Sequence, residues 1–580
     1  MKLKLALTAS LLSLAATPAL ADDGAVLYNS ASIAKDVPSQ LKRQQSDHYR
    51  ALFSAMSANQ WDVAKNLLDN APTGPLKPIA QAEYFLAANS PRAELGPLLT
   101  LVNEAPQIPQ AAQLGRLAQK RGAQLLPSLP QRRNLSWVPG SPIRSKPRDV
   151  DSDSTANSVR GQIIEFIKTD NPQGAEQLLN ASAMQMSPEG RTELEQRVAW
   201  SYYIENDDAS ALRLAQQAQN GAGDWVGHAN WVAGLAAWRM NDCRTAGSAF
   251  EKVGRSAANV DLKAAALYWS ARSDLKCGQP ERVQGKLQAA ARLDDSFYGL
   301  LAAQTLGMEP DRSDATDTFE KSDWHALERH ENVRAAIALV EIGQEQLADE
   351  VLRHQATIGD DSDHPALIKL ARELDLPRTQ IWLAHNAPRG MKPDVLAGFP
   401  APKWKPDGGW RVDPALIYAH TLQESAFRSQ VVSPANAIGL MQVRPGTAGD
   451  IARANGMNFN EADLYRPSTN LEYGQSYLEY LGNSSITEGK LPKIAAAYNA
   501  GPGAVQRWNS EIKDNDDPLL FMESIPYVET RGYVSIILRN YWMYEKQAGI
   551  QSVSARALSQ NHWPRFPGHP DKRKTQFTSR

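Results

Sequence analysis

One helix near the C-terminus carries an acidic side chain where an apolar one is expected. Asp413 and Pro414 are suited to begin this helix, because Asp caps a helix and Pro needs no N–H at the first helical position. One face of the helix then carries, at helical spacing, Ile417, His420, Glu424 and Phe427. A carboxyl group partly withdrawn from water has a raised pKa, which suits a general acid near neutral pH. This helix alone, however, favours the alternative that Glu424 reaches solvent at a helix end.

Three later segments add side chains able to contact sugars. Met441 and Gln442 follow a glycine, and Tyr498-Asn499 end a small-residue helix at Gly-Pro-Gly. Glu529 and Tyr533 share one face of a later helix. Taken singly, these are an ordinary helix cap, a first-turn glutamate and a core tyrosine. Their combination in one part of the chain favours a site.

Length and composition define the class of protein. With 580 residues, the chain is too long for one hydrophobic core, so we expect several domains. It contains 42% apolar and 22% charged residues, which is typical of globular domains. The formal net charge of −2 gives no indication of nucleic acid as a partner.

The first 21 residues have the pattern of a secretory signal peptide. A basic start, residues 1–4, precedes an apolar run at residues 5–16 and a small-residue cleavage site at residues 19–21. The run is too short to span a bilayer, and no later segment is apolar enough, so we expect no membrane anchor. The pattern predicts an exported, soluble protein of a bacterial periplasm.

Helix-turn-helix units that recur at roughly 35 residues predict a mainly α fold with a repeat superhelix. A stretch rich in Pro and Ser, about 128–157, predicts either a connector lying over the surface or a mobile linker. Cys243 and Cys277 fall at equivalent turns of adjacent repeats, so a disulfide between them is geometrically reasonable, as are two free thiols. Without clustered histidines they make a poor metal site, and we expect no metal and no cofactor.

The last part of the chain resembles the soluble lytic murein transglycosylases over about residues 404–546. The resemblance lies in an ordered series of motifs: Glu424-Ser425, Ser433-Pro434-Ala435, Gly439-Leu440-Met441-Gln442, Pro445-Gly446-Thr447-Ala448, Ala497 to Gly503, and Glu529-Thr530-Arg531-Gly532-Tyr533. The upstream repeats resemble the superhelix of that family more loosely, and residues 296–303 resemble the start of its linker domain.

The residue patterns and this resemblance together predict five segments. They are a signal peptide at 1–21, an α-superhelical domain at 22–295, a helical linker domain at 296–400, a lysozyme-like catalytic domain at 401–550 and a flexible tail at 551–580.

The resemblance also implies a reaction and its residues. Glu424 would act first as acid and then as base, cleaving the bond between N-acetylmuramic acid and N-acetylglucosamine without water and leaving a 1,6-anhydro end. The residues implied to bind the sugars or support Glu424 are Ser433, Met441, Gln442, Tyr498, Asn499, Glu529 and Tyr533. Arg444 and Asn436 depart from the family pattern, in which Met and Gly are common.

Two other functions stay open at this point. A hydrolytic muramidase on the same fold would use water in place of the sugar hydroxyl, and a non-catalytic scaffold would only bind peptidoglycan. Peptidoglycan glycan strands are the expected partner in all three cases. Other cell-wall enzymes as partners, exo- or endo-lytic action and closure of the helical domains into a ring stay undecided.

Overall fold

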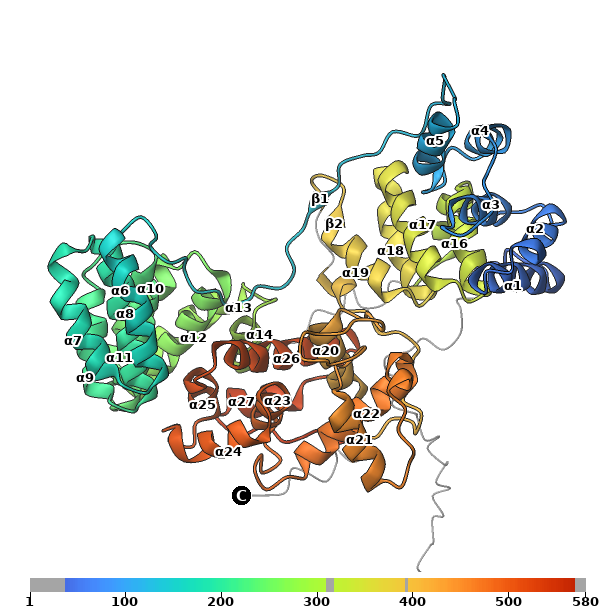
Figure 1. Cartoon of the computed structure of the whole chain (residues 1–580). Coiled ribbons are helices and arrows are strands. Elements are labelled where there is room, and N and C mark those ends of the chain that lie inside the picture. Colours follow the sequence, from blue (N-terminus) through green and yellow to red (C-terminus); the bar gives the residue numbers. More distant parts are fainter. Residues whose placement is uncertain (1–36, 309–317, 392–394, 569–580) are drawn as a thin grey trace, which may run out of the picture.

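Helices make up nearly all of the regular structure in this chain. The computed structural model describes residues 37–308, 318–391 and 395–568, and the predicted signal peptide lies outside them. Among the described residues, the one sheet is a two-stranded antiparallel pair. The prediction of a mainly α fold is therefore confirmed. In Figure 1 the helices form three groups, with α6–α14 on one side of α20–α27 and α1–α5 with α15–α19 on the other.

Four consecutive helix pairs build the superhelical group. In its turns a residue with positive φ ends the first helix: Asp170, Asn206, Asn241 and Gly278. Asn, Asp and Gly tolerate this left-handed conformation, which explains the polar turns in the sequence. In three of the turns, a capping side chain then accepts a hydrogen bond from the start of the next helix: Asn171, Asp207 and Asp242. The helices are α6 (Ser154–Lys168), α7 (Pro172–Ser182), α8 (Pro188–Ile204), α9 (Asp208–Ala218), α10 (Trp225–Arg239), α11 (Cys243–Ser256), α12 (Val260–Lys276), α13 (Val283–Ala291) and α14 (Phe297–Thr305), with short 3-10 turns η2 (Ala183–Gln185) and η3 (Pro280–Arg282).

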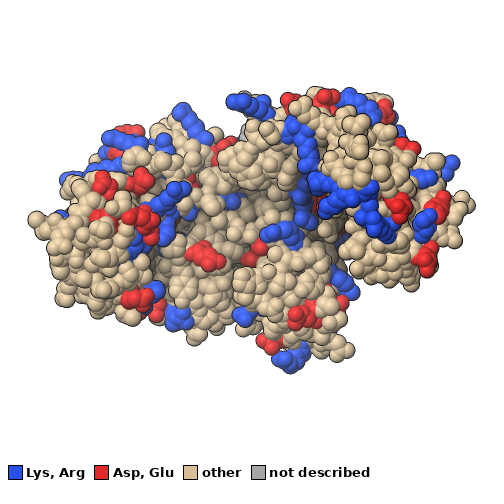
Figure 2. Space-filling model, turned by 45° about the horizontal axis from the view of Figure 1, so that its top comes forward, with Lys and Arg blue, Asp and Glu red and all other residues tan. Residues whose placement is uncertain are grey.

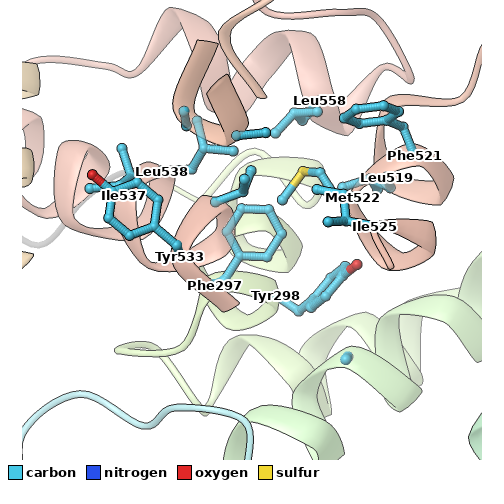
Figure 3. Close-up of a cluster of buried hydrophobic side chains, with 14 of the residues drawn as sticks. Phe297, Tyr298, Leu519, Phe521, Met522, Ile525, Tyr533, Ile537, Leu538 and Leu558 are labelled. Carbon is cyan, nitrogen blue, oxygen red and sulfur yellow. The ribbon is translucent and has the colours of Figure 1, made fainter. Parts of the chain in front are cut away.

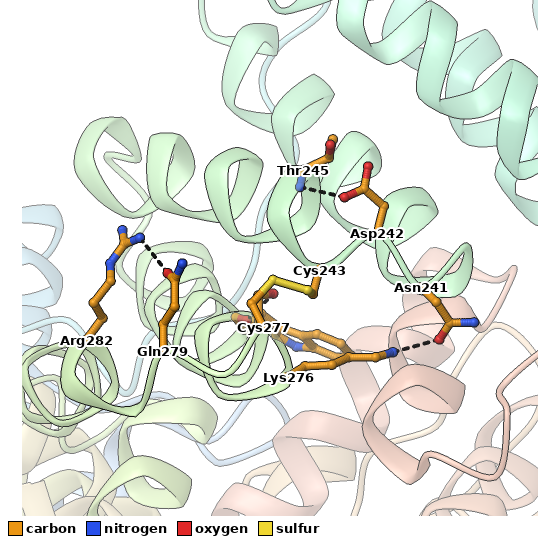
Figure 4. The surroundings of a disulfide bond; sticks show 10 residues. Asn241, Asp242, Cys243, Thr245, Lys276, Cys277, Gln279 and Arg282 are labelled. Atoms are coloured by element: carbon orange, nitrogen blue, oxygen red, sulfur yellow. Dashed lines mark hydrogen bonds between the residues drawn. A yellow bond between two sulfur atoms is a disulfide. The ribbon is translucent and has the colours of Figure 1, made fainter.

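A disulfide joins two of these turns. Cys243 begins α11 and Cys277 follows α12, and their Cα atoms lie 5.6 Å apart (Figure 4). Beside the bond, the Lys276 ammonium donates to the side-chain oxygen of Asn241. The disulfide considered from the sequence is therefore present, and it ties the third helix pair to the fourth.

The N-terminal helices pack against helices that follow much later in the chain. Their shared hydrophobic core contains Leu52, Leu98, Leu339 and Leu370 among its fully buried members. The early helices are α1 (Arg43–Ser57), α2 (Trp61–Asp69), α3 (Lys77–Leu86), α4 (Leu95–Glu104) and α5 (Ala111–Lys120). The later ones are α15 (Lys321–Leu327), α16 (Glu331–Glu341), α17 (Glu345–Ile358), α18 (His364–Glu373) and α19 (Pro377–His385), with the 3-10 turns η4 (Asp361–Asp363) and η5 (Val395–Gly398).

This packing groups the helices differently from the sequence. The segment 22–295 was expected to form one superhelical domain, but its first helices share a core with residues 319–397, whereas α6–α13 share one with α20–α27. The domain boundaries of the sequence analysis thus stay predictions about the order of segments along the chain.

The Pro- and Ser-rich segment connects α5 to α6. It contacts the segment after α19 and also helix α26. Its strand β1 (Ser136–Trp137) pairs antiparallel with β2 (Asn386–Ala387), and the ring of Trp137 stacks on His385 at 5.1 Å. Farther along, the carbonyl of Pro142 accepts a hydrogen bond from Arg539. Of the two alternatives, the connector lying over the surface is the one found.

The third group carries the predicted site. It consists of α20 (Pro414–Ser425), α21 (Pro445–Ala454), α22 (Pro467–Gly482), α23 (Leu491–Ala500), α24 (Pro502–Glu511), α25 (Pro518–Ser524), α26 (Val528–Gln547) and α27 (Val553–Ser559), with the 3-10 turn η6 (Glu461–Tyr465). Central helix α26 packs against α20 and α23, which brings the predicted site segments together.

Aromatic packing fixes the superhelix to this group. Phe297 and Tyr298 of α14 lie against side chains of α25, α26 and α27, with the ring of Phe297 stacked on Trp542 at 4.9 Å (Figure 3). The Tyr298 hydroxyl donates to buried Glu523 at 2.7 Å. Arg144 of the connector binds the same Glu523 at 2.6 Å and Asp261 of α12 at 3.2 Å. One buried network therefore joins connector, superhelix and α25.

The C-terminal segment differs from the expected flexible tail. Residues 553–559 form α27, whose Leu558 is fully buried, and Trp563 donates its indole N–H to Asp516 at 2.7 Å. The backbone carbonyl of the next residue, Pro564, accepts a hydrogen bond from the backbone N–H of Leu491. The prediction is wrong as far as residue 568, because Ala555 and Leu558 of this segment are buried in the core of the third group. Residues 569–580 lie outside the described residues.

The face drawn in Figure 2 is hollowed between the groups. Basic and acidic side chains are interspersed over this face, and Lys and Arg gather along one border of the hollow.

Candidate active site

Helix α20 holds Glu424 at its C-terminal end. Asp413 caps the helix start by accepting from the backbone of Ala415, and it also accepts from the hydroxyl of Tyr541 on α26. The helix ends directly after Glu424, because Ala426 and Phe427 both have positive φ. Phe427 is fully buried, and this burial offsets the cost of the strained conformation. The turn fixes Glu424 beside a loop and leaves it half-buried.

One side chain binds an oxygen of Glu424 directly, and a second side chain supports the first. The Tyr533 hydroxyl of α26 donates to Oε1 of Glu424 at 2.6 Å. The same hydroxyl lies 2.9 Å from Nδ1 of His420, one turn before Glu424 on α20. Because the Tyr533 proton points to Glu424, Nδ1–H of His420 donates to the tyrosine oxygen. A hydrogen-bonded chain thus runs from His420 through Tyr533 to Glu424.

The surroundings keep Glu424 protonated near neutral pH. Burial raises the pKa of Glu424 to about 7, the Tyr533 hydrogen bond lowers it in part, and the Glu529 carboxylate raises it again. Burial also lowers the pKa of His420 to about 3, so its imidazole is neutral and fits the donor role. Glu424 is thus partly withdrawn from water at the end of α20.

The second carboxylate differs in kind. Glu529 lies in the first turn of α26 and is exposed, and it acts on Glu424 through charge. The two carboxyl groups therefore lie in different surroundings, one half-buried and one exposed to solvent.

A loop after α20 carries two of the predicted residues, Ser433 and Gln442. Ser433 closes a tight turn by accepting from the backbone of Ala437 at 3.0 Å. Gln442 has positive φ and donates its side-chain N–H groups to the carbonyls of Val431 and Gly439. The described residues use only the amide nitrogen of Gln442 in hydrogen bonds, so its carbonyl oxygen is the group that can serve a ligand.

Met441 differs from the expectation of a substrate contact. Its side chain is fully buried, and its sulfur lies where a Cβ at Gly474 would have to stand. Its backbone carbonyl accepts from the Tyr498 hydroxyl at 2.8 Å. Met441 therefore contributes to the site through its backbone, because its apolar side chain fills the space under α22.

The end of α23 supplies the other wall. Burial, with the Glu424 carboxylate, raises the pKa of Tyr498 well above its ordinary value, so the phenol stays protonated. The Tyr498 ring lies 4.6 Å from the ring of His420. Neighbouring Asn499 accepts from the hydroxyl of Thr530 at 2.6 Å, which joins α23 to the first turn of α26. Tyr498, Asn499, Glu529 and Tyr533 are thus brought together around Glu424.

The two departures from the family pattern lie side by side. Asn436 has a positive φ of 57°, a conformation that Gly adopts freely and Asn tolerates, which explains the exchange. Asn436 and exposed Arg444 line a hollow of about 300 Å³ together with Thr447.

Sequence reasoning missed the role of His420. It noted His420 on the face of Glu424 but assigned it nothing. The signal was present, because residues four apart on a helix lie on one face and Tyr533 was already predicted to point inward.

The described part of the chain contains neither a metal-binding cluster nor a membrane-spanning helix. In residues 37–308, 318–391 and 395–568, no group of three or more His, Cys, Asp or Glu side chains is arranged to hold a metal ion. Within the same ranges, no helix has both the length and the hydropathy to cross a bilayer.

Comparison with known proteins identifies the class of domain at this site. Residues 405–521 match the family described as Transglycosylase SLT domain. The soluble lytic murein transglycosylase of Salmonella typhimurium is 38% identical over 163 residues, which are 27% of this chain and 24% of that protein. The Escherichia coli K12 protein of the same name is 39% identical over 136 residues, 22% of this chain and 20% of that one. The chain thus matches about a quarter of the length of these curated relatives.

The whole fold has a solved counterpart. The 70 kDa soluble lytic transglycosylase of Escherichia coli aligns over 90% of this chain and 99% of its own, with a TM-score of 0.56 and 18% identity. The resemblance to the soluble lytic murein transglycosylases is therefore confirmed, by sequence over residues 405–521 and by the overall fold.

Proposed function

We propose that this protein is a lytic transglycosylase of peptidoglycan, with Glu424 as its single acid and base. The observation that carries the proposal is the half-buried Glu424 carboxyl, whose pKa of about 7 keeps a proton available at neutral pH. Support comes from the sequence match of residues 405–521. It also comes from a solved lytic transglycosylase of Pseudomonas aeruginosa described as an inactive mutant in which one glutamate is replaced by glutamine.

The hydrogen bonds of Glu424 suggest which oxygen carries the proton. Tyr533 donates to Oε1, so the proton of the neutral acid resides on Oε2. Oε2 then protonates the glycosidic oxygen of the leaving sugar, while the 2-acetamido group stabilises the positive charge at C1. The C6 hydroxyl of the muramoyl sugar next attacks C1, its proton returns to Glu424, and the anhydro ring closes. One carboxyl group therefore serves both steps.

The remaining predicted residues act as positioning groups in this proposal. The carbonyl oxygen of Gln442 and the hydroxyl of Ser433 face the sugar from the loop, whereas Tyr498 and Asn499 shape the opposite wall. Glu529 raises the pKa of Glu424 and so keeps the acid protonated. Met441 supports the wall through Tyr498.

Export to the periplasm belongs to the same proposal. The signal-peptide pattern at residues 1–21 and the glycan substrate agree with this location, and the disulfide between Cys243 and Cys277 suits an oxidising compartment. The helices before residue 400 then serve access to the glycan rather than its chemistry.

Product analysis tests the reaction. Purified protein is incubated with sacculi in water enriched in oxygen-18, and the released muropeptides are weighed by mass spectrometry. We expect products with 1,6-anhydro ends, which are lighter by one water than the hydrolysed products and contain no oxygen-18. Reducing ends that carry oxygen-18 would instead identify a hydrolytic muramidase, and no release at all would favour the non-catalytic scaffold.

A further inference from the structure

The mechanism proposed above leaves one buried polar side chain beside Glu424 without a role. His420 lies one turn before Glu424 on α20, and only 1% of its surface is exposed. Its Nδ1 lies 2.9 Å from the hydroxyl of Tyr533, and its ring lies 4.6 Å from the ring of Tyr498. A buried polar group costs free energy unless it is hydrogen-bonded. The partner of His420 is the residue that itself binds Glu424.

His420 cannot take part in the chemistry directly. With 1% of its surface exposed, it does not reach the cleft in which a sugar would lie. Burial lowers its pKa to about 3, so the imidazole is uncharged at neutral pH and is a poor base for a hydroxyl group. The described part of the chain also contains no group of three or more His, Cys, Asp or Glu side chains that could hold a metal ion with it. An effect of His420 on the reaction therefore passes through a neighbouring side chain.

The Tyr533 hydroxyl can be oriented in two ways between its partners. A hydroxyl has one proton to donate and lone pairs that accept. In one arrangement, Tyr533 donates to Oε1 of Glu424 at 2.6 Å and accepts from Nδ1–H of His420. In the other, Tyr533 donates to Nδ1 and its oxygen accepts the acid proton of Glu424. Only the first arrangement leaves the acid proton free for a glycosidic oxygen, and only the first gives the ionised carboxylate a donor.

We propose that His420 is a positioning residue of the reaction, which holds the Tyr533 hydroxyl as a donor to Oε1 of Glu424. The proposal rests on the function proposed above, because it concerns the proton that Glu424 gives and takes back. Nδ1–H of His420 occupies the tyrosine oxygen, so the acid proton stays on Oε2. Linked hydrogen bonds also polarise one another, so the same N–H makes Tyr533 a stronger donor to the carboxylate. One oxygen of Glu424 is thereby reserved for the protein and the other for the sugar.

The other titratable groups that face these side chains come from three helices. Glu529 of α26 is exposed and raises the pKa of Glu424 through its charge. Tyr498 of α23 faces the same carboxyl group, and Tyr477 of α22 lies 5.4 Å from the Tyr498 ring. Burial raises the pKa of both phenols, so both stay protonated at neutral pH. In the described part of the chain, His420 is thus the one side chain placed to donate to the linking tyrosine.

A matched pair of substitutions isolates the hydrogen bond of His420. His420→Asn and His420→Leu both remove the imidazole ring and its contact with Tyr498, and the two new side chains have nearly the same shape. His420→Asn alone keeps an N–H group near the place of Nδ1, so it should rescue what His420→Leu loses. On soluble glycan strands, we expect kcat of His420→Leu to fall about fivefold below that of His420→Asn, with equal KM.

The pH–activity profiles of the same pair give a second readout. The alkaline limb of kcat/KM should lie at higher pH in His420→Leu than in His420→Asn, because the ionised form of Glu424 is less well supported and its pKa is higher. Circular dichroism and thermal denaturation establish that both variants are folded. Equal kcat of the two folded variants, or limbs at the same pH, would overturn the proposal.

A double-mutant cycle tests whether His420 acts through Tyr533. In a Tyr533→Phe background the hydroxyl is absent, so His420→Asn and His420→Leu should have the same kcat and the same pH–activity profile. If the difference in kcat between them persists in this background, His420 acts by another route and the proposal is overturned.

One measurement on the wild-type protein needs neither a folded variant nor turnover. The protein contains 10 histidines, and nitrogen-15 NMR of their labelled rings shows which ring nitrogen carries the proton. The signals of His420 are assigned by nuclear Overhauser contacts with the Tyr498 ring. We expect the proton on Nδ1 at pH 6 and at pH 8, on both sides of the Glu424 pKa of about 7. A proton on Nε2 at either pH would overturn the proposal. If the wild-type protein releases no 1,6-anhydro products, the proposed function fails, and the NMR result still decides how His420 orients Tyr533.

Discussion

The superhelix and the helices around Glu424 differ in which residue types adopt the left-handed backbone conformation. In the turns between α6 and α13, positive φ occurs at Asp170, Asn206, Asn241 and Gly278, residue types that tolerate it. Around Glu424 it occurs at Ala426, Phe427 and Gln442, whose side chains make it costly. The repeat turns thus contain residues that adopt this conformation at little cost. The backbone is strained at Ala426 and Phe427, next to the residue proposed to carry the chemistry.

Buried polar groups show the same contrast. In the superhelix, Asp208 pairs with Arg239 at 2.6 Å, so charge meets opposite charge. At the site, Glu424 accepts a hydrogen bond from the neutral Tyr533 hydroxyl, which the neutral imidazole of His420 supports in turn, while Glu529 disfavours the ionised form of Glu424. In the superhelix, buried charges are paired with opposite charges. In the proposed catalytic region, one carboxyl group has a raised pKa and can therefore gain or lose its proton near neutral pH.

Removal of the disulfide should have the largest effect on stability. The double variant Cys243→Ala/Cys277→Ala loses a cross-link between two helix pairs, and we expect the superhelix to lose about 3 kcal/mol. Urea denaturation followed by tryptophan fluorescence measures this. Turnover at 25 °C should be unchanged, because the bond lies far from Glu424 in the fold. A loss of activity in fully folded variant protein would break the separation between the two regions.

Replacement of Glu424 should stabilise the protein at high pH. The folded pKa of about 7 lies above the ordinary value of 4.5, so the cost of ionising Glu424 is absent below pH 4.5 and grows as the pH rises to 7. We expect Glu424→Gln to gain about 1–3 kcal/mol over wild type at pH 8 and nothing at pH 4. Thermal denaturation at both pH values measures the gain. The control is the same substitution at an exposed glutamate, Glu461→Gln.

Loss of one hydroxyl tests the hydrogen-bonded chain. Tyr533→Phe removes the donor to Oε1 of Glu424, and we expect kcat/KM to fall about tenfold. Because this hydrogen bond lowers the pKa of Glu424, the alkaline limb of the pH–activity profile should move to higher pH. Tyr202→Phe removes a hydroxyl bound to Glu176 in the superhelix and is the matched control. An unmoved limb in Tyr533→Phe would contradict the role of Tyr533.

Glycine substitutions test the smallest effect, the backbone contrast itself. Ala426→Gly removes a Cβ from a strained position, and we expect a gain of about 1 kcal/mol. Asp170→Gly in the superhelix should be nearly neutral, whereas Asp170→Ala should cost about 1 kcal/mol. Free energies of unfolding from denaturant titration compare the three variants. A gain of equal size at both glycine substitutions would remove the distinction.

Local patterns predicted much of this fold. Asp, Asn and Gly before a capping residue mark the repeat turns, and the residues around Glu424 could be assigned because helical spacing and turn chemistry are local. The pairing of the N-terminal helices with α15–α19 could not be predicted, because that core is formed by segments far apart in the chain. The same holds for Met441, whose burial depends on its contact with Gly474, and for the docking of α27.

The central claim is that Glu424 acts as both acid and base. Turnover by the Glu424→Gln variant tests this claim most directly. Release of soluble muropeptides from sacculi is measured for wild-type and variant protein at pH 7, with circular dichroism and glycan binding as controls for folding. We predict a loss of about a thousandfold or more in rate with binding retained. A variant that is folded, binds glycan and clears sacculi within about tenfold of the wild-type rate would contradict the account.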